Sequence, residues 1–348
     1  MAKSTIYEVA RLSGFSTATV SRVMRNGAGF SAETRKQVLT AAAELGWVPN
    51  HSARSLAARR AGIVGVLFPD LGVSDDIDSE SALFVDQVIR GAERAAALAG
   101  DAVLIAGTRG HSGAELARSV ASKVDGLVVV ARSLSDKELV ALSRRVPIVV
   151  LATSGARHKL DFVGADNRGG SQEVTAHLLT RHGLRDLAFV AGPSRSPDSQ
   201  ERFVGYCQAL SEAGLKVPES PDVHGGFTES GGARAVTELI GARRRPPQAV
   251  VFGNDEMALG GLPVLRRLKL RVPSEVAVTG FDDISAARHV RPALTTVRQP
   301  MREIGETAVR ALLERIGDRE AARRTTMLPT ELVVRSSCGC RMPGMASA

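Results

Sequence analysis

The sequence predicts a small all-α head followed by an α/β body of two doubly wound lobes. Up to about residue 48, the apolar residues recur only at helical spacing. From residue 63 onward, apolar runs of strand length alternate with helical stretches, which is typical of parallel sheets that helices cover on both faces. The length of 348 residues leaves room for two or three domains, in agreement with this division.

The composition is that of an ordinary globular protein. Hydrophobic residues make up 44% of the chain and charged residues 24%, which excludes a disordered or fibrous protein. No apolar run approaches the ~18–20 residues that a membrane span needs. The N-terminus lacks the apolar segment of a secretory signal, so we expect a cytoplasmic protein with no membrane partner.

Most of the net positive charge lies in the head. Residues 1–60 carry nine Lys and Arg against three Glu, a net charge of +6, whereas the whole chain carries +8. A basic head on a nearly neutral body indicates a module that binds a polyanion, joined to a domain with another task.

Three helices are expected in the head. Thr5, with Glu8 three residues later, forms a capping-box pattern, and Gly14 allows the tight turn that ends the first helix. Ser16 caps a second helix and Ser31 a third. Two short helices joined by a three-residue turn form the helix-turn-helix pattern. The residues expected to face the core of the head are Val9, Ala10, Leu12, Val20, Val23, Met24, Val38, Ala42 and Leu45.

The exposed face of the second helix suits the major groove of DNA. Thr17, Ala18 and Ser21 are small and leave room for close approach to the base edges. Arg22 is long enough to reach O6 and N7 of a guanine.

The body shows the strand-helix alternation twice. Apolar runs lie at 63–68, 102–106, 126–130 and 148–151, and again at 187–190, 249–252 and 276–278. Helical stretches lie at 84–99, 115–120, 171–180, 202–213, 231–240 and 255–267. Two such series predict two lobes, with a ligand held near the carboxyl ends of the strands.

Sequence signatures of enzymes and metal sites are absent. The chain contains no G-x-G-x-x-G, Walker A or G-x-S-x-G motif, so we expect no enzymatic activity and no cofactor. The seven histidines are dispersed, with no pair at metal-binding spacing. Cys338-Gly339-Cys340 supplies two of the four ligands of a structural zinc site, so we expect no metal and a loose, reduced tail there.

The head is identified as similar to the DNA-binding head of the lactose-repressor (LacI/GalR) family. The resemblance lies in 5–10 (TIYEVA), 16–23 (STATVSRV) and 45–50 (LGWVPN), and it continues through 51–56 (HSARSL) into the hinge helix of that family. The body resembles the effector-binding core of the same family, which is related in fold to periplasmic sugar-binding proteins. The matching segments of the body are 166–170, 253–258, 280–283, 292–297 and 328–332.

The resemblance implies a set of residues that bind DNA. A hinge stretch of seven residues at 52–58 is too short to be helical alone and would fold when docked on DNA. Leu56 would act there as the wedge that opens a base step from the minor groove, unless it is simply a linker leucine. The implied DNA-binding residues are Thr5, Ser16, Thr17, Ala18, Thr19, Ser21, Arg22, Asn50, Ala53 and Leu56.

The resemblance also implies the domain bounds and the effector site. The helix-turn-helix domain would span 1–48, the hinge 49–61, the core 62–340 and a disordered tail 341–348. Within the core, the N-lobe would hold 62–162 and 291–322, and the C-lobe 163–290 and 323–340. The implied effector-binding residues, whose polar groups suit a polyol and which could instead be structural, are Phe84, Asp166, Arg202, Asn254 and Asp282.

These features together predict an allosteric transcriptional regulator, and specifically a repressor. Its partners would be a pseudo-palindromic operator in double-stranded DNA, a carbohydrate effector and a second copy of the chain. The tail after Val334 has no leucine heptad, which favours a dimer over a tetramer. The alternatives are a cytosolic sugar-binding protein without a regulatory role, a regulator with a nucleobase or nucleoside corepressor, and an α/β enzyme that acts on sugars. Whether the effector releases DNA or promotes its binding stays open.

Overall fold

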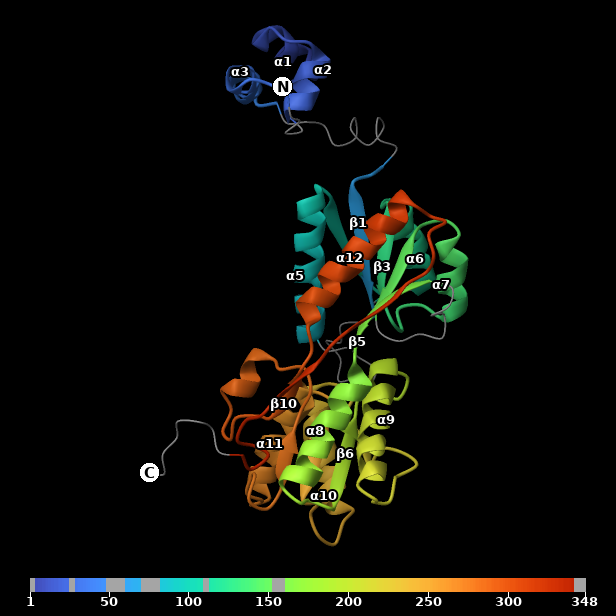
Figure 1. Cartoon of the computed structure of the whole chain (residues 1–348), viewed down its shortest axis with the longest axis vertical. Helices are drawn as coiled ribbons and strands as arrows, with labels where there is room; N and C mark the ends of the chain where they lie inside the picture. The colour runs from blue at the N-terminus through green and yellow to red at the C-terminus, as the bar shows by residue number, and fades with distance from the viewer. Residues whose placement is uncertain are drawn as a thin grey trace. The chain divides into compact units, whose positions relative to one another are not determined.

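The computed structural model describes residues 4–24, 29–47, 60–69, 82–108, 113–151 and 160–340 (Figure 1). The chain divides into two compact units, Met1–Gly62 and Ile63–Ala348, which are taken separately below. None of the helices described in either unit is long and apolar enough to cross a membrane.

The head is a cluster of three helices, α1 (Ile6–Ser13), α2 (Thr17–Met24) and α3 (Ala32–Glu44). The predicted helix starts are confirmed. Glu8 accepts hydrogen bonds from both the backbone N–H and the hydroxyl of Thr5, and the hydroxyl oxygens of Ser16 and Ser31 accept the N–H of the residue three positions later. Gly14 ends α1 in the left-handed region, at a φ of 74°.

The three helices of the head share one small apolar core. Its fully buried residues are Val9, Val20, Val23, Val38, Ala41 and Ala42. Within α2 and α3 they recur at helical spacing, and all of them except Ala41 were predicted from the sequence. Leu12 was expected in this core, but its side chain is half-exposed on α1.

The first lobe is a six-stranded parallel sheet covered by helices on both faces. Its strand order is β11-β5-β4-β3-β1-β2. Its strands are β1 (Ile63–Phe68), β2 (Ala102–Gly107), β3 (Gly126–Val130), β4 (Ile148–Leu151), β5 (Asp161–Ala165) and β11 (Thr325–Leu328). Its helices are α5 (Ala82–Ala99), α6 (Gly113–Ala121), α7 (Asp136–Ser143) and α12 (Met301–Gly317).

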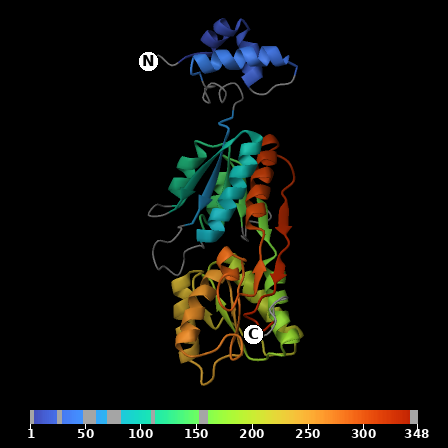
Figure 2. The same ribbon diagram turned by 90° about the vertical axis from the view of Figure 1, so that its left-hand side faces the viewer.

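Successive residues of each strand pack on opposite faces of this sheet. Val64 and Val66 of β1 join the core under α5 and α12, whereas Leu67 joins the core under α6 and α7. Figure 2 shows α12 lying alongside α5. A Cβ on Gly91 of α5 would lie 1.9 Å from the carbonyl oxygen of Arg302, so this close approach of the two helices requires glycine. α12 was not predicted, although its buried residues recur at helical spacing.

The second lobe is a four-stranded parallel sheet in the order β7-β6-β8-β9. Its strands are β6 (Leu187–Ala191), β7 (Val223–His224), β8 (Ala249–Phe252) and β9 (Ala277–Thr279). The pair α8 (Asn167–Arg181) and α9 (Pro197–Glu212) covers one face, and α10 (Glu229–Gly241) with α11 (Asp255–Arg267) covers the other. A short 3-10 helix, η1 (Ser285–Arg288), follows β9.

The chain passes between the lobes three times, and the pairing of the strands corrects the predicted lobe bounds. β10 (Thr296–Arg298) and β12 (Glu331–Val333) form an antiparallel pair at two of the passages. β11 pairs with β5, so residues 325–328 belong to the first sheet and not to the C-lobe range 323–340. Thr295 forms a β-bridge with Thr279 of β9. The first residues of the range 291–322, which was predicted for the N-lobe, therefore lie against the second sheet. Short polar strands such as β11 carry no apolar run that could have marked their place.

A buried ion pair fastens the end of α12 to β5. Arg315 donates from Nε and Nη2 to the two carboxylate oxygens of Asp161, at 2.7 and 3.0 Å, and both side chains are almost fully buried. The same guanidinium donates to backbone carbonyl groups between 318 and 322. The backbone N–H of Arg324 also donates to Asp161. One arginine thus fixes the helix, the loop after it and the sheet.

Candidate DNA-binding and ligand-binding sites

The predicted recognition face of α2 is accessible in the structure. Ala18 and Arg22 are exposed, and Thr17 and Ser21 are half-buried. The guanidinium carbon of Arg22 lies 5.2 Å from the centroid of the Phe30 ring, a cation-π distance that gives the long side chain a preferred direction. This face offers one oriented cation among small side chains, which suits a base edge better than a phosphate alone.

Two other predicted DNA contacts also have structural tasks in the head. Ser16 caps α2 through the N–H of Thr19, at 3.1 Å, and its hydroxyl lies 3.0 Å from that of Thr19. Thr5 is exposed at the start of α1, where its N–H lowers the pKa of the Glu8 carboxyl by hydrogen bonding. Asn50, Ala53 and Leu56 lie outside the described residues, so their DNA-binding roles stay predictions.

Tyr7 is a further candidate that the sequence analysis missed. It is 75% exposed on α1, although it stands between the inward-facing Ile6 and the core residue Val9. A large aromatic side chain held in water on a basic head is suited to packing on a sugar-phosphate backbone. Tyr7 and Val9 are two residues apart, which places them on opposite faces of a helix. This spacing was the signal that could have identified Tyr7 as exposed.

Four polar side chains, those of Asn167, Arg202, Asp282 and Gln299, meet close to the carboxyl ends of β5, β9 and β10. Arg202, on α9, donates from Nε to the amide oxygen of Asn167 at 2.8 Å and from Nη1 to the carbonyl oxygen of Gly253 at 2.5 Å. The same Nη1 lies 3.4 Å from a carboxylate oxygen of Asp282. Gln299 donates to that carboxylate at 2.6 Å. Each of these side chains is nearly fully buried.

Aromatic rings enclose the guanidinium of Arg202. Its central carbon lies 3.9 Å from the ring centroid of Phe281 and 5.5 Å from that of Phe227. Rings on a guanidinium provide attraction through the ring quadrupole without adding hydrogen-bond acceptors. The donors of Arg202 are therefore available to polar partners in the plane of the guanidinium.

Asp282 is held in an unusual state by its surroundings. Its φ of 120° lies in the left-handed region, where a residue other than glycine is strained. Burial raises the pKa of its carboxyl to about 7, while Arg202 and Gln299 act in the opposite direction. A strained residue with a perturbed pKa at the end of a strand marks a candidate functional site.

Asp282 should make the stability of the core depend on pH. Because burial raises its folded pKa from the ordinary 3.8 to about 7, its contribution favours the folded state fully below about pH 4 and is lost as the pH rises through about 7. We expect wild type to lose free energy of unfolding relative to Asp282→Asn across this range, at up to about 1.4 kcal/mol per pH unit. Urea unfolding at several pH values measures this difference. Glu219→Gln, at an exposed position, is the control, and parallel pH profiles for wild type and Asp282→Asn would contradict the assignment.

The structure brings together two of the five predicted effector residues, Arg202 and Asp282. Asn254 is buried, but its amide already caps α11 and donates to the carbonyl of Phe227. Asp166 caps α8 through the N–H of Gly169, and Phe84 is buried in the core of the first lobe. Contact of these five residues with an effector stays a prediction.

Four members of the cluster were not predicted from the sequence: Asn167, Phe281, Gln299 and Phe227. The first two stand beside predicted residues in the matching segments 166–170 and 280–283, and this adjacency was the signal for them. Gln299 lies in the chain passage before α12 and reaches Asp282 across 17 residues. No local pattern identifies such a contact.

A buried carboxyl group behind the cluster was also missed. Asp255, at the start of α11, accepts hydrogen bonds from the Thr296 hydroxyl at 2.5 Å and from the N–H of Ile284 at 3.0 Å. Complete burial raises its pKa well above the ordinary value, and Asp282 adds to the shift. Asp255 therefore ties α11 to β10 and to the segment after β9, and it has a structural task.

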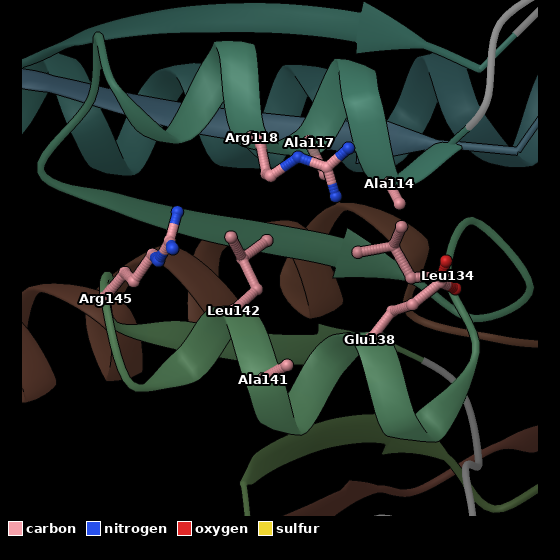
Figure 3. A pocket seen from close by; sticks show the side chains of 8 residues that line it. All are labelled: Ala114, Ala117, Arg118, Leu134, Glu138, Ala141, Leu142 and Arg145. Carbon is pink, nitrogen blue, oxygen red and sulfur yellow. The ribbon is translucent and has the colours of Figure 1, made fainter.

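A separate groove lies between α6 and α7 in the first lobe (Figure 3). Its lining is largely alanine and leucine, together with the charged side chains Arg118, Glu138 and Arg145. Glu138 is already bonded to Ser135 at the start of α7. No predicted effector residue lines this groove, so the prediction of a ligand site depends on the polar cluster around Arg202.

The C-terminal cysteines do not form the loose tail that the sequence predicted. Cys338 is buried and Cys340 half-buried in ordered turns after β12, beside His177 and His182 at the end of α8. The expected dispersal of the histidines therefore fails for this pair. In sequence, His177 and Cys338 are 161 residues apart, so only the folding of the chain brings them together.

The chain has a helix-turn-helix head and a two-lobe core with a buried polar cluster at the strand ends. This combination defines a class of protein that joins DNA binding to ligand binding. Residues 5–50 match the bacterial regulatory proteins of the lacI family, and residues 176–338 match the periplasmic binding protein-like domain. The chain is 33% identical over 339 residues to the HTH-type transcriptional repressor PurR of Vibrio campbellii (strain ATCC BAA-1116), and 31% identical over 338 residues to catabolite control protein A of Priestia megaterium. Each alignment covers 96% of this chain and 98% of the relative.

Solved structures agree with these matches. A complex of the transcriptional regulator CelR with cellobiose has a TM-score of 0.71 and 32% identity, covering 96% of this chain and 100% of that chain. The lac repressor dimer bound to operator and the anti-inducer ONPF has a TM-score of 0.80 and 26% identity, covering 97% and 99%. The chain belongs to the lacI family of bacterial regulatory proteins, and it is a DNA-binding transcriptional regulator.

Proposed function

We propose that the protein is a homodimeric repressor whose affinity for a pseudo-palindromic operator changes when a carbohydrate binds to the core. The observation that supports this proposal is a buried cluster at the strand ends of the core, in a chain that also has a basic helix-turn-helix head. The cluster consists of Arg202, Asp282, Asn167 and Gln299. We place its action in the cytoplasm and assign it no enzymatic activity. The proposed operator contacts are Thr5, Ser16, Thr17, Ala18, Thr19, Ser21, Arg22, Asn50, Ala53 and Leu56.

The chemistry of the cluster favours a polyol over an apolar ligand. A carboxylate, a guanidinium and two amides supply both acceptors and donors, which vicinal hydroxyl groups match. Arg202 and Asp282 form an ion pair with each other, and a sugar would exchange this pair for contacts with its own hydroxyl groups. The cellobiose complex of the 32% identical CelR supports this ligand class.

Selection of DNA from a random pool, followed by mobility shifts with and without sugars, tests the proposal. We expect a pseudo-palindromic site bound by two chains, and an affinity that changes with one member of a panel that begins with cellobiose and ribose. Linkage requires that operator DNA change the sugar affinity by the same factor. Sugar binding without DNA binding would favour the sugar-binding alternative. A response only to nucleobases or nucleosides would favour the corepressor alternative.

Arg22→Ala should weaken operator binding by ~1–3 kcal/mol, because one bidentate contact to a guanine is lost. Binding to random DNA of the same length should change much less, since phosphate contacts dominate it. Fluorescence anisotropy with both DNAs at fixed salt measures the two losses. Arg11→Ala, a matched exposed arginine on α1, is the control. Equal losses on both DNAs would make Arg22 a phosphate contact.

A further inference from the structure

Four side chains with metal-binding atoms meet at the C-terminal end of α8. His177 lies in the last turns of this helix, His182 directly follows it, and Cys338 and Cys340 lie in the turns after β12. One ligand atom from each residue lies within 4.8 Å of all the others. Arg202 contacts Asn167 at the opposite end of α8, about 20 Å away for a helix of this length, so the two clusters are distinct.

Four of the six distances between the ligand atoms match the edges of a coordination tetrahedron, and all six are within 4.8 Å. With Zn–N distances of 2.0–2.1 Å and Zn–S distances near 2.3 Å, a tetrahedral zinc ion separates two nitrogens by about 3.3 Å and a nitrogen from a sulfur by about 3.6 Å. The two Nε2 atoms are 3.3 Å apart. The Sγ atoms of Cys338 and Cys340 are each 3.6 Å from Nε2 of His177, and Sγ of Cys340 is 3.4 Å from Nε2 of His182.

Hydrogen bonding alone does not explain this convergence. Nε2 of His177 faces three heavy atoms at 3.3–3.6 Å, but a neutral imidazole nitrogen has only one proton or one lone pair to direct in the ring plane. A metal ion at the centre would satisfy all four atoms at once.

The surroundings hold the two cysteines in place. Gly339 has a φ of 104°, a conformation that favours glycine and lets the chain turn between Cys338 and Cys340. The hydroxyl of Thr295 donates to Sγ of Cys338 at 3.2 Å, which would stabilise a thiolate. Ser337 donates to the carbonyl of Val278 and accepts from the N–H of Thr295, so the segment is anchored to the second lobe.

We infer that His177, His182, Cys338 and Cys340 form a structural site for Zn²⁺. Two imidazoles and two thiolates are ligands that zinc prefers, and four protein ligands leave no open position for a substrate. Two thiolates also balance the charge of the ion. The bound ion would fasten the C-terminal segment to α8, as a cross-link between parts of the chain that lie far apart in sequence. This inference does not depend on the proposed function.

The test uses the untagged full chain, purified without chelator and dialysed against metal-free buffer. We expect one zinc per chain by elemental analysis. Removal of zinc with a strong chelator should lower the melting temperature by about 2–4 °C or more, and added Zn²⁺ should restore it. Cobalt loaded in place of zinc should show the visible bands of a tetrahedral ion and a thiolate-to-cobalt charge-transfer band.

Matched variants separate this site from adventitious binding. Cys340→Ser and His182→Asn should each lose the zinc, and their cobalt forms should lose the bands of the tetrahedral thiolate site. Their far-ultraviolet circular dichroism spectra should match wild type, which would show that the fold is intact. Cys207→Ser and the exposed His289→Asn should bind one zinc as wild type does. Zinc content that is the same in all four variants would overturn the inference. The inference would also be overturned if added Zn²⁺ did not change the melting temperature of the metal-free wild type, or if the mass of the chain showed a Cys338–Cys340 disulfide.

Discussion

Replacing Arg315 by alanine should lower the free energy of unfolding of the core by ~3–5 kcal/mol, because the change leaves the buried carboxylate of Asp161 without its main partner. Among the residues that the structure describes, the carboxylate would keep only the N–H of Arg324 and a distant contact to Arg323, at 3.8 Å. Backbone carbonyl groups between 318 and 322 would also lose their donor. Urea unfolding followed by circular dichroism measures this loss. Tryptophan fluorescence would not report on the core, because the one tryptophan of the chain, Trp47, lies in the head.

The same helix offers a matched control for this prediction. Arg310 forms an exposed pair with Glu306 at 3.1 Å, and its loss should change the free energy of unfolding by no more than ~0.5 kcal/mol. Arg315→Met combined with Asp161→Leu should recover part of the loss, because no orphaned charge remains. If Arg315→Ala and Arg310→Ala were equally mild, the buried pair would have no special weight in the fold.

If the proposed sugar effector binds at the polar cluster, Arg202→Met should abolish the response of the protein to it, while operator binding by the free protein stays nearly unchanged. Methionine retains apolar bulk between the Phe281 and Phe227 rings but removes every donor. Loss of hydrogen bonds from a charged group should weaken sugar binding by about 10–100-fold or more. Calorimetry with the sugar found in the screen, together with operator titrations, measures both properties.

A structural account of Arg202 predicts a different set of results. If the contacts to Asn167 and Asp282 serve mainly to hold the second lobe together, Arg202→Met should lower the melting temperature and operator affinity along with the sugar response. Arg168→Met is the matched control, because it breaks an exposed pair with Glu201 between the same two helices, α8 and α9. Loss of all three properties in Arg202→Met alone would remove it from the ligand site.

Local features of the chain were predictable from the sequence. The caps at Ser16 and Ser31 act within three residues, and the core positions of the head follow from the helical repeat. The apolar runs became β1 to β4, β6, β8 and β9. All of these except the edge strand β2 are buried on both faces, and a strand buried on both faces must be apolar throughout. The strands that were missed are β5, β7, β10, β11 and β12. The last four have two to four residues and are only partly buried, so their sequences need not be apolar throughout. β5 is fully buried, but Asp161 and Gly164 interrupt its apolar run.

The sequence by itself determined the head, the class of fold of the core and, through its matching segments, the family. Only the tertiary structure decided which side chains meet. It joined Gln299 to Asp282, Arg315 to Asp161 and Cys338 to His177 across 17, 154 and 161 residues. Periodicity and capping arise from interactions over a few residues, so they are visible in residues that are close together in the sequence. Contacts between distant residues depend instead on strand order and on where the chain crosses between lobes, and a single sequence holds no local pattern for either.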